Sequence, residues 1–126
     1  MERESSDYLE TAGVCSGFEG PRILPDQPLD ARTRHDVLCS LREMLRNAVR
    51  HGKPTQVTVR ITVDNGLKLT VEDDGAGFDW PAAKAEGRGV SGLEARAREH
   101  GGSMEVRSVP GKTSVSLFFP FQQNGA

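Results

Sequence analysis

The chain has 126 residues, the common size of a single domain, which leaves room for one hydrophobic core. Hydrophobic residues make up 36% and charged residues 27% of the chain, a composition that excludes disordered and fibrous proteins. Its 16 basic and 18 acidic side chains give a net charge of −2, so no global field would draw the chain to nucleic acid or to an anionic membrane.

The cysteines and the lack of a targeting signal indicate a reducing cytoplasm. Cys15 and Cys39 are too few for a disulfide framework, and they lack the spacing of a metal site. Both are therefore predicted to be packing residues. No signal peptide or long apolar run is visible. The unusual feature of the composition is its 14 glycines, several of which cluster between residues 75 and 102.

The N-terminal third of the chain predicts one strand and one helix. Residues 1–13 are polar and lack apolar periodicity, so they are predicted to be a flexible leader. Glycines and prolines interrupt residues 14–28, which allows one short strand and an irregular loop. Asp30 or Thr33 can then cap a helix whose apolar residues recur every three or four positions until glycine and proline end it at 52–54.

The rest of the chain predicts four strands and a second helix. Alternating apolar residues at 57–63 and 67–71, joined by an Asp-Asn-Gly turn, predict a β-hairpin with one buried face. The glycine-rich stretch 72–92 is predicted to be a long loop, and loops of that length in a compact domain are usually functional or mobile. A helix from about 91 to 100 follows, closed by two glycines. The last two predicted strands are 104–109 and 114–119. This order predicts an α+β sandwich with helices on one face of a mixed or antiparallel sheet.

Three polar segments carry candidate chemistry, and each has an ordinary structural alternative. Glu43 and Asn47 share one helix face, where a solvated surface is the alternative. Asp73 directly follows a strand and can accept a hydrogen bond from the exocyclic amine of adenine, but a tight acidic turn would look the same. Residues 87–93 lead into the second helix, whose free amides and dipole favour phosphate, with a flexible linker as the alternative. Their spacing excludes a Walker loop and a dinucleotide fingerprint.

Taken in order, four motifs resemble the N, G1, G2 and final glycine boxes of the GHKL (Bergerat-fold) ATPase superfamily. They are Glu43-x-x-x-Asn47, Asp73-x-Gly75-x-Gly77, Gly87-x-Gly89 and Pro110-Gly111-Lys112-Thr113. Within that superfamily, residues 41–51 and 92–97 resemble the catalytic domain of bacterial two-component sensor histidine kinases paired with helix-turn-helix response regulators. The resemblance implies a two-layer α/β sandwich of the Bergerat type, with a mixed sheet and helices on one face. The domain would span residues 14–121, followed by a tail at 122–126.

The resemblance also implies which residues would bind ATP and Mg²⁺. Asn47 would ligate Mg²⁺, which prefers hard oxygen donors, and Glu43 would polarise a water or the attacking histidine. Asp73 would select adenine, and Thr113 would support the water network beside the base. Residues 78–90 would form a lid over ATP. The nucleotide would also be contacted by Gly75, Gly77, Gly87, Arg88, Gly89 and Val90.

The histidine that would receive the phosphate is not expected in this chain. In the family that the chain resembles, the acceptor lies on a dimeric helical hairpin, for which 126 residues leave no room. His35-Asp36 resembles an acceptor pair, but it lies on the helix of Glu43, about 12 Å away at the usual rise per residue. His35 is therefore interpreted as an exposed helix residue. His100, beside the closing glycines, is expected to interact with the dipole of the second helix.

The implied partners are the phosphoacceptor domain of a parent kinase and a cognate response regulator, with no nucleic acid. The isolated domain is expected to be a cytoplasmic monomer, whether the parent kinase is soluble or membrane-attached. An anti-sigma-factor-like serine kinase of the same superfamily is an alternative, because it carries the same boxes without a hairpin. The arginine-rich stretch 95–98 favours the sensor kinase. A non-catalytic nucleotide-binding module is the second alternative, against which intact Glu43 and Asn47 argue.

Overall fold

The computed structural model describes residues 9–11, 13–20, 30–52, 54–75, 90–109 and 111–121, without the side chains of residues 51, 52, 90 and 91. Its strands and α-helices follow the predicted order. The elements are β1 (Cys15–Glu19), α2 (Ala31–Asn47), the π-helical turn η1 (Ala48–Gly52), β2 (Gln56–Val63), β3 (Gly66–Asp73), α4 (Val90–Glu99), β4 (Ser103–Val109) and β5 (Lys112–Pro120).

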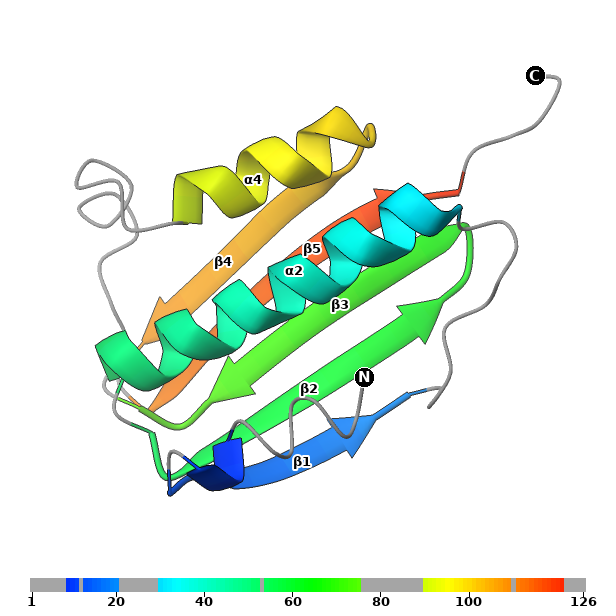
Figure 1. Ribbon diagram of the computed structural model, residues 1–126. Coiled ribbons are helices and arrows are strands. Elements are labelled where there is room, and N and C mark those ends of the chain that lie inside the picture. Colours follow the sequence, from blue (N-terminus) through cyan, green and yellow to red (C-terminus); the bar gives the residue numbers. More distant parts are fainter. Residues whose placement is uncertain are drawn as a thin grey trace, which may run out of the picture.

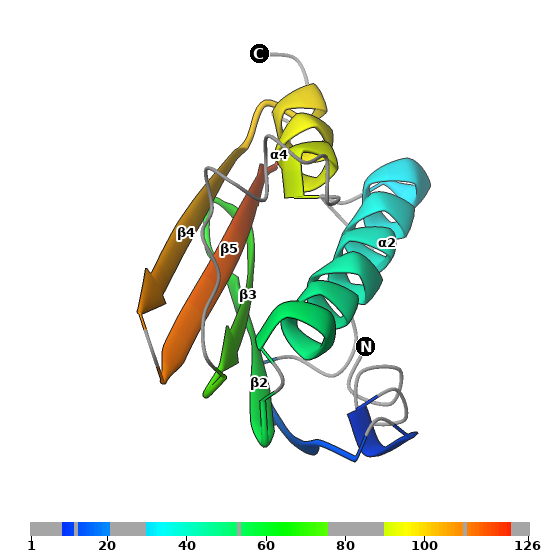
Figure 2. The same ribbon diagram turned by 90° about the vertical axis from the view of Figure 1, so that its left-hand side faces the viewer.

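The strands form one five-stranded sheet in the order β1-β2-β3-β5-β4 (Figure 1). Strand β1 pairs with β2 in parallel, and the other neighbouring pairs are antiparallel, so the sheet is mixed. Helices α2 and α4 lie side by side on the same face of the sheet (Figure 2). The predicted α+β architecture, with a mixed sheet and helices on one face, is confirmed. No helix of the described residues is long and apolar enough to cross a membrane.

The hydrophobic core lies between the sheet and the two helices. Every second side chain of β2 and β3 is buried along the middle of each strand, as the alternation predicts. Helix α2 contributes residues spaced three and four apart. Burying one such side chain contributes roughly 1.5–3 kcal/mol. The core residues exposed by 2% or less include Val37, Leu41, Met44, Leu45, Val57, Val59, Ile61, Leu67, Leu69, Val71, Leu93, Ala97, Leu117 and Phe119.

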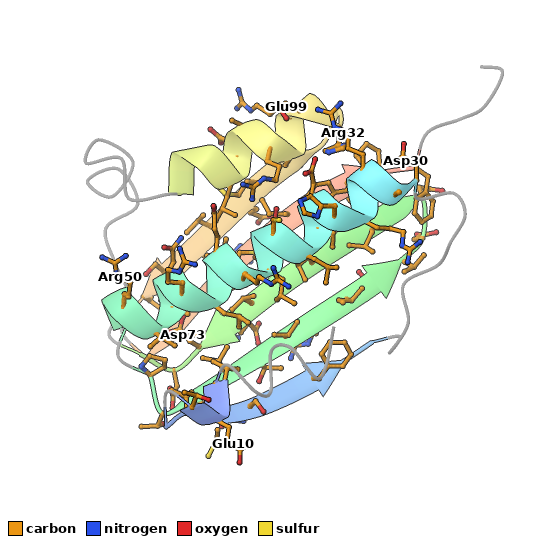
Figure 3. The ribbon with its side chains drawn as sticks, in the orientation of Figure 1. Glu10, Asp30, Arg32, Arg50, Asp73 and Glu99 are labelled. Carbon is orange, nitrogen blue, oxygen red and sulfur yellow. The ribbon has the colours of Figure 1, made fainter. Side chains whose placement is uncertain are left out.

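Helix α2 has a side-chain cap at its start and a π-helical turn after its end. Asp30 is its N-cap, since its Oδ1 accepts a hydrogen bond from Thr33 N at 2.7 Å (Figure 3). That bond lowers the pKa of Asp30. The predicted helix to residue 52 changes into a π-helical turn after Asn47. Such a wider turn is rare and is frequently found at functional sites.

Two residues of the N-terminal segment depart from the prediction. Leu9 lies in the expected flexible leader but is fully buried in the core, and its carbonyl accepts a hydrogen bond from Val14 N at 2.8 Å. Cys15 was expected to pack, but it is exposed, because its neighbour Val14 takes the inward position. Cys39 is half-buried, with its Sγ 3.4 Å from Nε2 of His35, and both cysteines are free.

The predicted glycine stop of α4 is confirmed as a Schellman motif. Gly101 has the left-handed φ of +79°, and Gly102 N donates to the carbonyl of Ala97 at 2.8 Å. A Cβ on Gly102 would lie 1.7 Å from the carbonyl oxygen of Phe118, so only glycine fits between the end of α4 and β5. The backbone is therefore pressed against the sheet at this end of the helix.

His100 joins the two helices instead of serving only the dipole of its own helix. Its Nε2 lies 2.6 Å from Oδ2 of Asp36, and its Nδ1 lies 3.4 Å from Oγ1 of Thr33, both on α2. The ring meets Phe119 edge-on, with the ring centroids 5.6 Å apart. His35, by contrast, is exposed on α2, as predicted. Asp36, the second residue of the acceptor-like His35-Asp36 pair, thus helps to hold α4 against α2.

Replacing Asp36 by alanine is expected to destabilise the fold through this contact. The buried Nε2 of His100 would lose its acceptor, which should lower the free energy of unfolding by about 1–3 kcal/mol. Urea unfolding measures the loss. The matched control is Glu99→Ala, an exposed acidic residue of α4, which should change stability by less than about 0.5 kcal/mol. Equal losses for the two variants would contradict the role assigned to His100.

Candidate functional site

One small pocket collects residues from both helices and from the middle of the sheet. It lies where α2 ends and β3 ends, a position that Figure 3 marks with the label of Asp73. Asp73 and Asn47 supply its polar groups, and its other lining residues are apolar. The pocket has the usual make-up of a small-molecule site, an apolar wall with a few polar groups, at a volume of only about 10 Å³. The lining residues are Met44, Asn47, Ala48, Val71, Asp73, Leu93 and Val115.

Asp73 is the buried carboxylate of this pocket. It is the last residue of β3, and only 6% of it is exposed. Burial raises the pKa of Asp73, and the charge of Asp74 adds to the rise. A hydrogen bond of 2.9 Å from Gly75 N to Oδ1 opposes that rise and holds the side chain against the following turn. The carboxylate is thus fixed in direction by backbone at the predicted position.

Asp74 holds the same corner of the sheet from the outside. Its Oδ1 accepts from Thr55 N at 2.8 Å and from Gln56 N at 3.0 Å, and its Oδ2 accepts from Thr55 Oγ1 at 2.5 Å. The bond from the Thr55 hydroxyl is the largest cause of the lowered pKa of Asp74. Sequence reasoning missed this anchor. The signal available to it was a second aspartate beside the first and a hydroxyl residue at the start of the paired strand.

The first and last glycine boxes come together at the end of β3. Gly111, whose φ is +88°, donates its N–H to the carbonyl of Gly75 at 2.9 Å. Thr113 pairs with Asp73 across β3 and β5, and it is 1% exposed. Its Oγ1 lies 3.1 Å from Oγ of Ser108. The structure therefore places Asp73, Gly75 and Thr113 side by side, although 38 positions separate Gly75 and Thr113 in the chain.

Glu43 and Asn47 lie one turn apart on α2, as predicted. Asn47 is half-buried at the pocket, just before the π-helical turn. The Glu43 side chain is 33% exposed, and its Oε1 lies 3.4 Å from Nη2 of Arg96 on α4. Its Oε2 is buried and has no hydrogen-bond partner among the described residues. The arginine was not among the predicted site residues.

Several predicted nucleotide-binding residues lie outside the described residues. These are Gly77, Gly87, Arg88 and Gly89, together with most of the predicted lid at 78–90. Val90 is described as the first residue of α4, but its side chain is not. Their assignments therefore stay predictions from the sequence.

The two neighbouring aspartates should affect stability with opposite dependence on pH. Burial raises the pKa of Asp73, so folding favours its protonated form, and its contribution to stability is lost as the pH rises above the ordinary aspartate value of about 4. Hydrogen bonds lower the pKa of Asp74, so its contribution is present above that value and is lost as the pH falls below it. Urea unfolding of Asp73→Asn and Asp74→Asn between about pH 3 and 7 measures both differences from the wild type. Slopes of the same sign would contradict the assignment.

The chain matches a known family over most of its length. Residues 39–123 match the family described as histidine kinase-, DNA gyrase B-, and HSP90-like ATPase. The match begins within α2, includes the motif at Glu43 and Asn47, and ends after β5. It therefore covers the described pocket.

Curated relatives of the chain are named as sensor histidine kinases. The chain is 38% identical over 130 residues to an uncharacterized sensor-like histidine kinase of Chloroflexus aurantiacus, which covers 97% of this chain and 21% of the relative. It is 42% identical over 82 residues to the sensor histidine kinase LiaS of Bacillus subtilis, covering 64% of this chain and 23% of that protein. The chain thus spans about a fifth of the length of these relatives.

A solved structure has the same fold. It is the histidine kinase domain of the blue-light activated histidine kinase from Erythrobacter litoralis EL346, with a TM-score of 0.75 and 22% identity. The superposition covers 95% of this chain and 62% of that one. The Bergerat-type fold predicted from the four motifs is therefore confirmed. The chain belongs to the histidine kinase-, DNA gyrase B-, and HSP90-like ATPase family, and the curated relatives that it matches are named as sensor histidine kinases.

Proposed function

We propose that this domain binds Mg-ATP and transfers the γ-phosphate to a histidine on a separate dimerisation and phosphoacceptor domain. The observation that carries the proposal is the pocket that unites Asn47 and Asp73 between the helices and the sheet, within the region matched to the ATPase family. A cognate response regulator would receive the phosphate next, in the cytoplasm. The catalytic domain would span 14–121, with Leu9 packed on it from the preceding segment.

The adenine end of the nucleotide would lie against Asp73. A carboxylate fixed by the Gly75 N–H and walled by Val71 and Leu93 can accept a hydrogen bond from the exocyclic amine of adenine. Thr113, buried beside Asp73, would support a water at the base. The adjoining glycines, Gly75 and Gly77, would let the chain pass close to the ring.

The triphosphate would lie toward the start of α4. Backbone amides at the first turn of a helix are free to bind anions, and the helix dipole adds to the attraction. Helix α4 begins at Val90 and is preceded by the glycine-rich box. Gly87, Arg88, Gly89 and Val90 are therefore the residues we assign to the phosphates.

Mg²⁺ fits the donor that the pocket offers. This ion keeps several waters and uses few protein ligands when phosphate oxygens are present. Asn47 provides a neutral hard oxygen at the pocket, and the described residues contain no cluster of three or more His, Cys, Asp or Glu side chains that could hold a metal. A single amide ligand of that kind suits an ion carried in with ATP. When bound, it would neutralise charge on the phosphates.

Catalysis would depend on positioning more than on covalent chemistry by the protein. The acceptor imidazole nitrogen would attack the γ-phosphorus while the bond to the β,γ-bridging oxygen breaks and ADP leaves. Glu43, one helical turn before Asn47, would accept a hydrogen bond from the imidazole or from a water and so orient the attacking nitrogen. Its place beside the metal ligand on α2 supports this role.

Asp73→Asn should weaken ATP binding, because the amide offers a donor where adenine also offers one. Losing one hydrogen bond to a charged group corresponds to about a 10- to 100-fold rise in Kd. Calorimetric titration with ATP measures it. Asp64→Asn is the matched control, since Asp64 is exposed in the β2–β3 turn, and it should bind as the wild type does. Unchanged affinity of Asp73→Asn would refute the assigned position of adenine.

Asn47→Ala should abolish Mg²⁺-dependent phosphate transfer while leaving adenosine binding nearly intact, because the amide would hold the metal and not the base. Incubation with labelled ATP and a separately made histidine hairpin measures the transfer, and titration with adenosine measures binding.

The label that the wild-type domain transfers should be acid-labile, as phosphohistidine is. An acid-stable label would support the serine kinase instead. Nucleotide binding without any transfer would support the non-catalytic module.

A further inference from the structure

The carboxylate of Glu43 is tied to the opposite helix by one arginine. Helices α2 and α4 lie side by side on the sheet (Figures 1 and 2). Arg96 lies in the middle of α4, and its guanidinium contacts two residues of α2. Its Nη1 lies 3.2 Å from Oγ of Ser40, and its Nη2 lies 3.4 Å from Oε1 of Glu43. Because Ser40 and Glu43 are three residues apart, they present their side chains on one face of α2. The guanidinium therefore spans both of them.

The contact fixes the direction of the Glu43 side chain more than it stabilises the fold. The side chains of Arg96 and Glu43 are 24% and 33% exposed, and partly exposed ion pairs at such distances contribute little to folding. Ser40, however, is fully buried, so it gives one arm of the guanidinium a fixed partner. The planar shape of the group then sets where its other arm meets Glu43.

The two carboxylate oxygens of Glu43 lie in different surroundings. Oε1 faces the guanidinium, whereas Oε2 is buried without a partner among the described residues. A buried carboxylate oxygen without a donor is costly, and such groups in native proteins call for an explanation such as a catalytic role. A donor brought in by an incoming molecule would satisfy it.

We propose that Arg96 is a positioning residue for phosphoryl transfer. It holds Glu43 through Oε1 at a fixed place relative to α4 and leaves Oε2 to accept a hydrogen bond from the incoming imidazole or water. Since α4 begins at the assigned phosphate site, the bridge also links the position of this carboxylate to the helix that would hold the triphosphate. The inference rests on the proposed transfer to histidine.

The test is a double-mutant cycle on the rate of transfer from labelled ATP to the separately made histidine hairpin. Arg96→Met should lower the maximal rate about tenfold or more, because small misplacements of a catalytic group are costly, with KM for ATP changed less than about twofold. Arg96→Lys should recover part of the rate. In the Glu43→Gln background, Arg96→Met should cause no further loss, because the residue through which Arg96 acts is already disabled.

The matched control is Arg98→Met, which removes another arginine of α4. Arg98 is 71% exposed and pairs at 3.7 Å with Glu94 of its own helix, so its loss should leave the rate within about twofold of wild type. Ser40→Ala gives an independent check, since it frees the guanidinium while keeping its charge. It should lower the maximal rate in the same direction as Arg96→Met but by less.

The outcomes separate this inference from the function on which it rests. A wild-type rate for Arg96→Met, or an equal loss with and without Glu43→Gln, would overturn the positioning role alone. A large rise in KM for ATP with an unchanged maximal rate would also overturn it, by making Arg96 a nucleotide ligand. Absence of transfer by the wild type would overturn the proposed function itself. If Arg96→Met fails to fold, Arg96→Lys and Ser40→Ala, each with and without Glu43→Gln, decide the matter.

Discussion

The register of β3 is the constraint on which the rest of the site depends. This strand pairs on one side with β2 and on the other with β5, so its position along both neighbours is fixed by two ladders of hydrogen bonds. A shift by one residue would turn Leu67, Leu69 and Val71 away from the helices, at the cost of the core. The same register brings Asp73 under the end of α2 and beside Thr113. One alignment thus sets both the core packing and the place of Asp73 in the pocket.

Asp73, the last residue of β3, and Asp74, which follows it, lie in contrasting surroundings. Asp74 receives three hydrogen bonds from Thr55 and Gln56 and closes the corner between β2 and β3. Asp73 receives one from Gly75 and lies in a pocket whose lining, apart from Asn47 and Asp73 itself, is apolar. A carboxylate that is desolvated but held in place is ready to interact with a ligand, because few competing donors must be removed first. The hydrogen bonds of Asp74 hold the end of the strand in place and so offset the cost of burying Asp73 there.

Patterns that act over a few residues predicted the fold well, and contacts between distant residues account for what was missed. Alternation at residues 57–61 and the glycines after α4 depend on local geometry, and both predictions were confirmed. The alternation was wrong at Val63, which is 43% exposed at the end of its strand. Asp73 and Asn47, which the resemblance assigns to one nucleotide site, line one pocket. Arg96, by contrast, meets Glu43 across 53 positions of the chain, and that pairing follows from the packing of α2 on α4. The burial of Leu9 likewise depends on tertiary packing that its polar neighbours conceal.

The close approach at Gly102 has a mechanical consequence for α4. With no room for a side chain against Phe118, and with His100 bonded to Asp36, the C-terminal end of the helix is clamped to both the sheet and α2. Leu93, in the first turn of α4, is buried in the core as well, so the helix is held near both of its ends. A rod held near both ends keeps its middle in place, and the middle of α4 is where Arg96 meets Glu43.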